Sequence, residues 1–133
     1  MILVDTSVWI DGFRGGIYKN VLVRLIDYGE LCVNDVILAE LLPSIRHRGE
    51  HHLELLLTAL PRLQMMTDWG ELIMMQTENL RHGINKVGLP DLMIVQNAIQ
   101  HNVRLLSSDK HFSLMEKIFN FDLYFSDTEL NFI

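Results

Sequence analysis

Short apolar runs alternate with longer amphipathic stretches along the whole chain. The apolar runs are typical of buried strands, which we expect at about residues 2–5, 31–33, 63–66, 103–106 and 123–125. The longer stretches have the spacing of amphipathic helices, expected at about residues 6–15, 17–28, 36–47, 51–60, 69–82, 90–101 and 110–118. Strands that alternate with helices indicate βαβ units and a parallel sheet. The pattern therefore predicts an α/β fold.

Capping and helix-breaking residues support these boundaries. Asn34 and Asp68 stand just before predicted helices, where their side chains can accept hydrogen bonds from the first turn. Pro90 suits the first turn of a helix, and Gly29 suits a helix end. Pro43 lies inside a predicted helix, which we expect it to bend.

The length and composition fit one domain that covers residues 1–133. Hydrophobic residues make up 49% of the chain, which is enough to fill a core. No stretch reaches the roughly 18 consecutive apolar residues of a membrane span. The N-terminal apolar run is short and follows no basic region, so it does not resemble a signal peptide. We therefore expect a soluble, cytoplasmic protein with no membrane role, whose single cysteine, Cys32, forms no internal disulfide.

Four acidic residues adjoin the apolar segments: Asp5, Glu40, Asp91 and Asp109. Asp5 and Asp109 come just after the first and fourth predicted strands. Glu40 lies one turn into the helix after the second strand, and Asp91 begins the helix that leads to the fourth. In an open parallel sheet, ligands bind outside the carboxyl ends of the strands. All four carboxylates can therefore face one edge of the sheet.

Carboxylates beside buried segments cost free energy unless they are paired or bind a metal. Four of them predict a site for a hard cation, Mg²⁺ or Mn²⁺, which supports the hydrolysis of a phosphodiester. Each acid also has an ordinary structural alternative as a helix cap, a first-turn acid or a half-exposed helix residue. Ser7 and Ser107 could orient a metal-bound water, with a capping or turn role as the alternative for both.

The net charge of −6 by itself argues against a nucleic-acid-binding protein, which usually carries a basic surface. Two bound Mg²⁺ ions would change the formal net charge from −6 to −2. Several basic residues are also clustered along the chain. The candidate phosphate contacts are Arg46, Arg48, Arg81, Lys86 and Lys110. The alternative is that these residues are ordinary solvent-exposed positions at helix ends and in loops.

Four segments in order along the chain resemble the PIN domain family, and most closely its VapC-type toxins of toxin–antitoxin pairs. They are Ile2-Leu3-Val4-Asp5-Thr6-Ser7-Val8-Trp9-Ile10, Ala39-Glu40-Leu41, Leu89-Pro90-Asp91-Leu92-Met93-Ile94 and Leu105-Leu106-Ser107-Ser108-Asp109-Lys110-His111-Phe112. Each motif alone is weak, but the four together span essentially the whole chain. The chain departs from the family at Ser107, where threonine is frequent, and at Val95-Gln96-Asn97, where small alanines are frequent.

The resemblance implies a single PIN-like domain whose five-stranded parallel sheet is flanked by helices on both faces. It implies a homodimeric endoribonuclease that depends on Mg²⁺ or Mn²⁺ and cleaves structured RNA such as transfer or ribosomal RNA. A VapB-type antitoxin would cover the acidic pocket and block it. Asp5, Glu40, Asp91 and Asp109 correspond to the family's acidic quartet, and Ser7 and Ser107 to its polar helpers.

Two other functions are weighed against this one. A receiver-like phospho-acceptor module has similar length, but it needs paired acids after the first strand, where Asp5 is followed by Thr6 and Ser7. It also needs an Asp after the third strand, for which Asp68 is a poor match. A catalytically silent PIN module that only binds a partner is disfavoured because all four acids are present.

Overall fold

A buried central strand organises the protein, which we describe from a computed structural model for residues 1–125. The strands β1 (Ile2–Val4), β2 (Leu31–Cys32) and β3 (Arg104–Leu106) form a parallel sheet in the order β2-β1-β3. All three residues of β1 are buried, which explains its uninterrupted apolar sequence. The parallel α/β arrangement predicted from the sequence is therefore confirmed.

The prediction of a five-stranded sheet is wrong for the described residues, in which the sheet has three strands. The two other expected strands contribute only isolated parallel bridges, Val33↔Arg62 and Leu105↔Leu123. After the first bridge, the carbonyls of residues 64 and 66 accept hydrogen bonds from the side chains of Asn97 and Gln100, which lie on a single later helix, instead of from a strand. This side-chain pairing ends the ladder on that side after one bridge.

Helices are present at every position where the periodicity predicts them. They are α1 (Thr6–Phe13), α2 (Lys19–Asp27), α3 (Asp35–His47), α4 (His51–Ala59), α5 (Trp69–Arg81), α6 (Leu89–His101) and α7 (Lys110–Glu116). The Asn34 side chain accepts a hydrogen bond from the Ile37 amide, and the Asp68 side chain accepts one from the Glu71 amide, so both predicted caps are confirmed. Helix α3 continues through Pro43 to His47.

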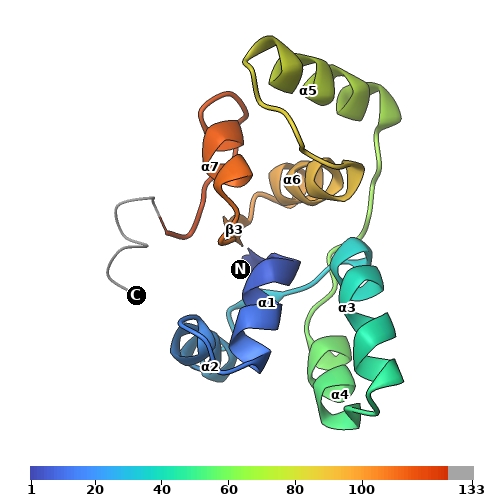
Figure 1. Ribbon diagram of the computed structural model, residues 1–133, viewed down its shortest axis with the longest axis vertical. Helices are drawn as coiled ribbons and strands as arrows, with labels where there is room; N and C mark the ends of the chain where they lie inside the picture. Colours follow the sequence, from blue (N-terminus) through green and yellow to red (C-terminus); the bar gives the residue numbers. More distant parts are fainter. Residues whose placement is uncertain (126–133) are drawn as a thin grey trace.

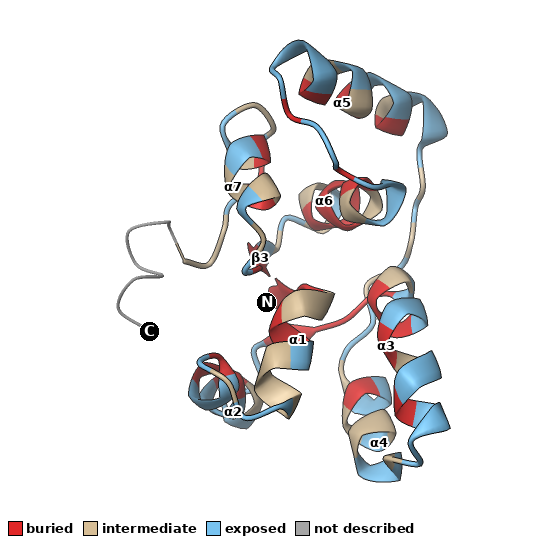
Figure 2. Cartoon of the chain, viewed as in Figure 1, coloured by how far each residue is buried: buried red, intermediate tan, exposed pale blue. Residues whose placement is uncertain are grey.

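The helices lie on both sides of the strands, with α1 to α4 below and α5 to α7 above in Figure 1. Helices α3 and α4 pack as a pair, as do α1 with α2 and α5 with α6, while α1 and α6 both contact α3. The buried residues form one apolar cluster along the strands and the inner helix faces (Figure 2). This packing places α6 against β3, and it places α3 against both α6 and α1, the helix that follows β1.

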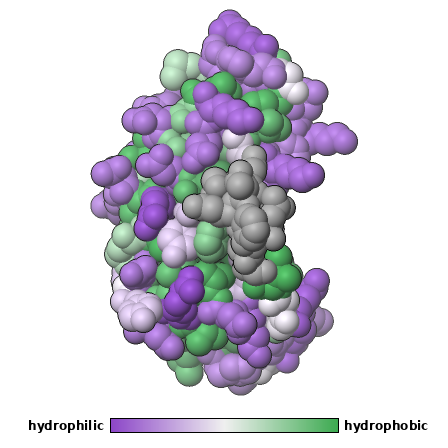
Figure 3. All heavy atoms as spheres, turned by 90° about the vertical axis from the view of Figure 1, so that its left-hand side faces the viewer, coloured by the Kyte–Doolittle hydropathy of each residue, from purple (hydrophilic) through white to green (hydrophobic). Residues whose placement is uncertain are grey.

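The surface carries a mixture of side chains. On the face drawn in Figure 3, apolar side chains lie between hydrophilic ones. Among residues 1–125, no helix has both the length and the apolar character that a bilayer span requires.

Candidate functional site

Asp5 is a buried acid held by two hydroxyl groups. It follows β1 directly, and its side chain is almost fully enclosed, with 5% of the residue exposed. Its backbone amide donates to the Leu106 carbonyl at 2.8 Å, which extends the pairing of β1 with β3. The Oδ2 atom accepts hydrogen bonds from Ser7 Oγ at 2.8 Å and from Ser107 Oγ at 3.0 Å. Asp5 occupies the N-cap position of α1, but its side chain makes no capping hydrogen bond.

The four acids influence one another electrostatically. Burial raises the pKa of Asp5 above its ordinary value, the hydroxyls of Ser7 and Ser107 oppose that rise, and Asp109 adds to it. The pKa of Asp91 is also raised, first by burial and then by the charges of Asp5, Asp109 and Glu40. Within residues 1–125, no Lys or Arg forms an ion pair with any of the four. They therefore form a cluster of negative charge whose one basic neighbour by ion-pair distance, among these residues, is His111 beside Asp109.

Asp109 has a more ordinary environment than Asp5. It caps α7, as its structural alternative predicted, because Oδ1 accepts from the His111 amide at 2.9 Å. The same oxygen lies 2.7 Å from His111 Nδ1. The Asp109 amide donates to Ser107 Oγ at 3.0 Å, so that one serine hydroxyl bridges Asp5 and Asp109.

Glu40 approaches the cluster from α3. It is exposed, and Oε1 accepts a hydrogen bond from Thr6 Oγ1 at 2.9 Å. Ser108 Oγ donates to Ser7 Oγ at 2.9 Å, which links the loop after β3 to the start of α1. The sequence interpretation did not include Thr6, Ser108 or His111. All three lie inside or beside the quoted motifs, which is the signal that could have identified them.

The donor set suits a hard divalent cation, because it consists of carboxylate oxygens near hydroxyl groups. In their present rotamers, however, no three His, Cys, Asp or Glu side chains among residues 1–125 are arranged around a common ion position. Glu40 Oε1 is instead hydrogen-bonded to Thr6, and Asp109 Oδ1 is hydrogen-bonded to His111. The residues that would hold a metal, once their side chains rotate toward a common position, are Asp5, Asp91, Asp109 and Glu40.

Most candidate phosphate contacts already have acidic partners, and they come from separate elements of the fold. Arg46 makes two hydrogen bonds to Glu54, while Arg48 pairs with Glu50 and Arg81 with Glu78. Arg46 and Arg48 lie at the end of α3, and Arg81 ends α5. Lys86 has a positive φ of 67° in the loop before α6, and Lys110 begins α7 next to Asp109. The structure therefore does not gather the five into one basic patch.

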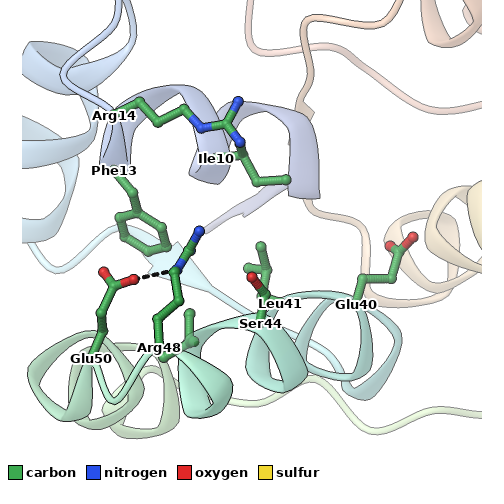
Figure 4. Close-up of a pocket in the computed structure, with 9 residues that line it drawn as sticks. Ile10, Phe13, Arg14, Glu40, Leu41, Ser44, Arg48 and Glu50 are labelled. Atoms are coloured by element: carbon green, nitrogen blue, oxygen red, sulfur yellow. Dashed lines mark ion pairs between the residues drawn. The ribbon is translucent and has the colours of Figure 1, made fainter.

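A pocket of about 290 Å³ lies between α1 and α3 (Figure 4). It shares Glu40 with the acidic cluster. Arg48 and Arg14 also line it. The sequence interpretation did not include Arg14, because nothing in the local pattern shows that α1 and α3 pack side by side.

Comparison with known proteins identifies the family. The PIN domain family profile matches residues 2–118. Among curated proteins, no sequence matches the chain.

Three solved structures are similar in fold. The VapBC2 structure from Rickettsia felis, bound to a promoter DNA fragment, has a TM-score of 0.69 and 21% identity, over 92% of this chain and 97% of that one. The DNA-bound VapBC structure from Salmonella typhimurium has a TM-score of 0.70 and 18% identity, over 92% of this chain and 95% of that one. The structure of FitAcB from Neisseria gonorrhoeae has a TM-score of 0.66 and 16% identity, over 94% of this chain and 97% of that one. Since the family profile covers most of the sequence and the fold agrees over nearly its whole length, the chain belongs to the PIN domain family.

Proposed function

We propose that this protein is a Mg²⁺- or Mn²⁺-dependent endoribonuclease and the toxin component of a toxin–antitoxin pair. The observation that carries the proposal is the acidic cluster at the ends of β1 and β3, which has no Lys or Arg ion-pair partner among residues 1–125. Asp5 in particular is buried, and its carboxylate accepts hydrogen bonds from two hydroxyl groups and the Thr6 backbone, with no Lys or Arg ion pair among the described residues. A charge buried in this way is costly unless a cation accompanies it. The nuclease would comprise the whole chain, residues 1–133.

Each residue of the cluster has a proposed role. Asp5, Asp91 and Asp109 would hold the metal, and Glu40 would bind it too or orient the attacking water. When bound, a divalent cation supplies positive charge that lowers the pKa of water and stabilises the leaving oxygen of a phosphodiester. Ser7 and Ser107 would keep the Asp5 carboxylate in one orientation through their hydrogen bonds.

The proposed partner is a VapB-type antitoxin. Two of the similar structures are VapBC complexes, and they match this chain over 92% of its length. We propose that a segment of the antitoxin covers the acidic cluster and blocks RNA. We also propose that the protein acts as a cytoplasmic homodimer on structured RNA, such as transfer or ribosomal RNA.

The test is cleavage of a total-RNA pool by purified protein, free of antitoxin. The reactions contain Mg²⁺, Mn²⁺ or EDTA, and Asp5→Asn protein runs in parallel. Discrete cuts that require the metal and are absent from the variant support the proposal, and mapping the new ends identifies the target. Normal cleavage by Asp5→Asn protein would disprove the assigned mechanism. Absence of cleavage by folded, metal-loaded protein against isolated transfer and ribosomal RNA would favour a module that only binds a partner.

The receiver-like alternative gains no support from the described residues. Asp68, its candidate acid after the third predicted strand, caps α5 through Oδ1. The backbone amide and carbonyl of Asp68 both bond to the Gln96 side chain. The Asp68 hydrogen bonds thus join the start of α5 to α6. Neighbouring acids instead raise the pKa of Asp5 and of Asp91, which belong to the cluster at the ends of β1 and β3.

A further inference from the structure

The pocket between α1 and α3 adjoins the acidic cluster through a shared residue. Its lining residues come from α1, α3 and the turn before α4: Ile10, Phe13, Arg14, Glu40, Leu41, Ser44, Ile45, Arg48 and Glu50. Figure 4 shows Arg48 extending from α3 toward α1 beside the Phe13 ring, with Arg14 above them on α1 and Glu40 farther along α3. An RNA strand bound at the acidic cluster could therefore extend directly into this pocket.

The lining combines an aromatic ring with two guanidinium groups. Arg14 is exposed and has no ion-pair partner among the described residues. Phe13 is partly buried and packs against Trp9, with ring centroids 5.7 Å apart, so that its ring is held in place. Aromatic rings stack on bases, and guanidinium groups bind phosphate through two parallel hydrogen bonds. This combination suits a nucleotide of a single strand.

One of the two guanidinium groups, that of Arg48, already forms an ion pair with Glu50. Arg48 Nε lies 2.5 Å from Glu50 Oε1, and both side chains are partly exposed, at 52% and 32%. Exposed ion pairs contribute little to stability, so that a phosphate can replace the Glu50 carboxylate at small cost. Local cations are needed here, because the net charge of −6 and the acidic cluster both repel RNA.

We propose that this pocket is a subsite for one nucleotide of single-stranded RNA, next to the phosphodiester that is cleaved. Phe13 stacks on the base, while Arg14 and Arg48 bind the phosphate, and Glu50 holds Arg48 until RNA replaces it. The RNA substrate in this inference rests on the proposed function. The pocket itself adds Phe13, Arg14 and Glu50 to the residues that determine which RNA is bound.

Arg46 provides a matched control. It lies in the last turn of α3, two residues before Arg48, which caps the end of that helix, and it is also exposed. It does not line the pocket, and its guanidinium group makes two hydrogen bonds to Glu54, of 3.1 and 3.0 Å. A general basic surface would use Arg46 and Arg48 alike, whereas the proposed subsite uses only Arg48.

The test measures the binding of a fluorescein-labelled single-stranded RNA oligomer of mixed sequence to full-length Asp5→Asn protein, which removes cleavage from the measurement. Arg14→Ala and Arg48→Ala should each weaken binding about tenfold and reduce the slope of log affinity against log salt by about 0.7. Phe13→Leu should weaken binding without changing that slope. Arg46→Ala should leave both unchanged, and Glu50→Gln should strengthen binding, because it frees Arg48.

Thermal melting of each variant establishes that it is folded before its binding is interpreted. The subsite proposal would be wrong if Arg46→Ala and Arg48→Ala reduced RNA affinity equally. It would also be wrong if neither Arg14→Ala nor Arg48→Ala reduced RNA affinity. If these two variants bind RNA normally but no longer retain the co-expressed antitoxin, the pocket belongs to a protein partner. Cleavage by the otherwise unchanged protein tests the proposed function separately, so failure of the subsite and failure of the nuclease are distinguishable.

Discussion

Ser107 Oγ donates a hydrogen bond of 3.0 Å to Asp5 Oδ2, across 102 residues of sequence. Ser107 Oγ itself accepts a hydrogen bond of 3.0 Å from the Asp109 amide. One hydroxyl group thus ties the end of β1 to the loop after β3 and orients a buried carboxylate. Parallel pairing of β1 with β3 makes this contact possible, because it brings the two strand ends to the same edge of the sheet.

Replacing Ser107 by alanine should weaken both metal binding and stability. The variant leaves the Asp5 carboxylate with one hydroxyl donor fewer, and an unsatisfied buried group costs about 1–3 kcal/mol. Loss of an orienting partner typically lowers metal affinity about 10–100-fold. Mg²⁺ titration by calorimetry and urea unfolding measure the two effects. Ser107→Thr keeps the hydroxyl and should restore both, and a Thr variant as impaired as the Ala variant would contradict this role.

Asp5→Asn should stabilise the metal-free protein at neutral pH. Because burial raises the pKa of Asp5 in the folded state, its charge opposes folding above that pKa. The neutral amide should increase the free energy of unfolding in EDTA by about 0.5–2 kcal/mol, the usual range for a single stabilising substitution. The measurement is urea unfolding at neutral pH.

The same pKa predicts how this difference depends on pH. As the pH falls through the raised pKa of folded Asp5 toward its ordinary value of 3.8, the wild-type acid takes up a proton and recovers stability. The advantage of Asp5→Asn should therefore shrink in acid and be largest at neutral pH. Asp27→Asn removes an exposed acid at the end of α2 and should show neither effect. If the stability advantage of Asp5→Asn over the wild-type protein grew on acidification, the pKa of Asp5 would not be raised in the folded state.

Addition of Mg²⁺ or Mn²⁺ should raise the melting temperature of the wild-type protein, and EDTA should reverse the rise. A ligand that binds only the folded state at about 100 times its Kd adds about 2.7 kcal/mol of stability. Asp5→Asn protein should show little response, because it lacks the central carboxylate. Sodium chloride at equal ionic strength controls for screening of the acidic cluster. An equal rise with the sodium salt would mean that screening, and not binding, is responsible.

Asn97→Ala should be destabilising, because the Asn97 side chain joins α6 to two other segments of the chain. Asn97 is buried, accepts a hydrogen bond from the Asn34 side chain at 3.0 Å and donates one to the Gln64 carbonyl at 3.0 Å. The variant leaves the buried Asn34 Nδ2 without this partner, whereas the Gln64 carbonyl still lies 2.8 Å from His101 Nε2. We therefore expect a cost of about 1–3 kcal/mol in urea unfolding. Gln100→Ala removes one exposed hydrogen bond, to the Met66 carbonyl, and should cost less than about 1 kcal/mol.

Local patterns in the sequence were sufficient for much of the fold. The apolar run of β1 predicts a buried strand, and Asn34 and Asp68 predict the helix starts that the structure contains. These features depend on neighbouring residues, and local spacing records them directly. Parallel pairing then places the residues that follow β1 and β3 at one edge, which is why Asp5 and Asp109 could be predicted to lie near each other.

The sequence by itself thus determined the helices, the central strand and the candidate acids. Only the tertiary structure decided which side chains those acids bond to, and how far the sheet extends. Thr6 with Glu40, and Ser107 with Asp5, are pairs of residues far apart in sequence, so no local periodicity encodes them. The pocket with Arg14 likewise exists only because α1 packs beside α3. The physical reason is that a hydrogen bond or a pocket needs groups within a few ångströms, and packing of the whole chain sets those distances.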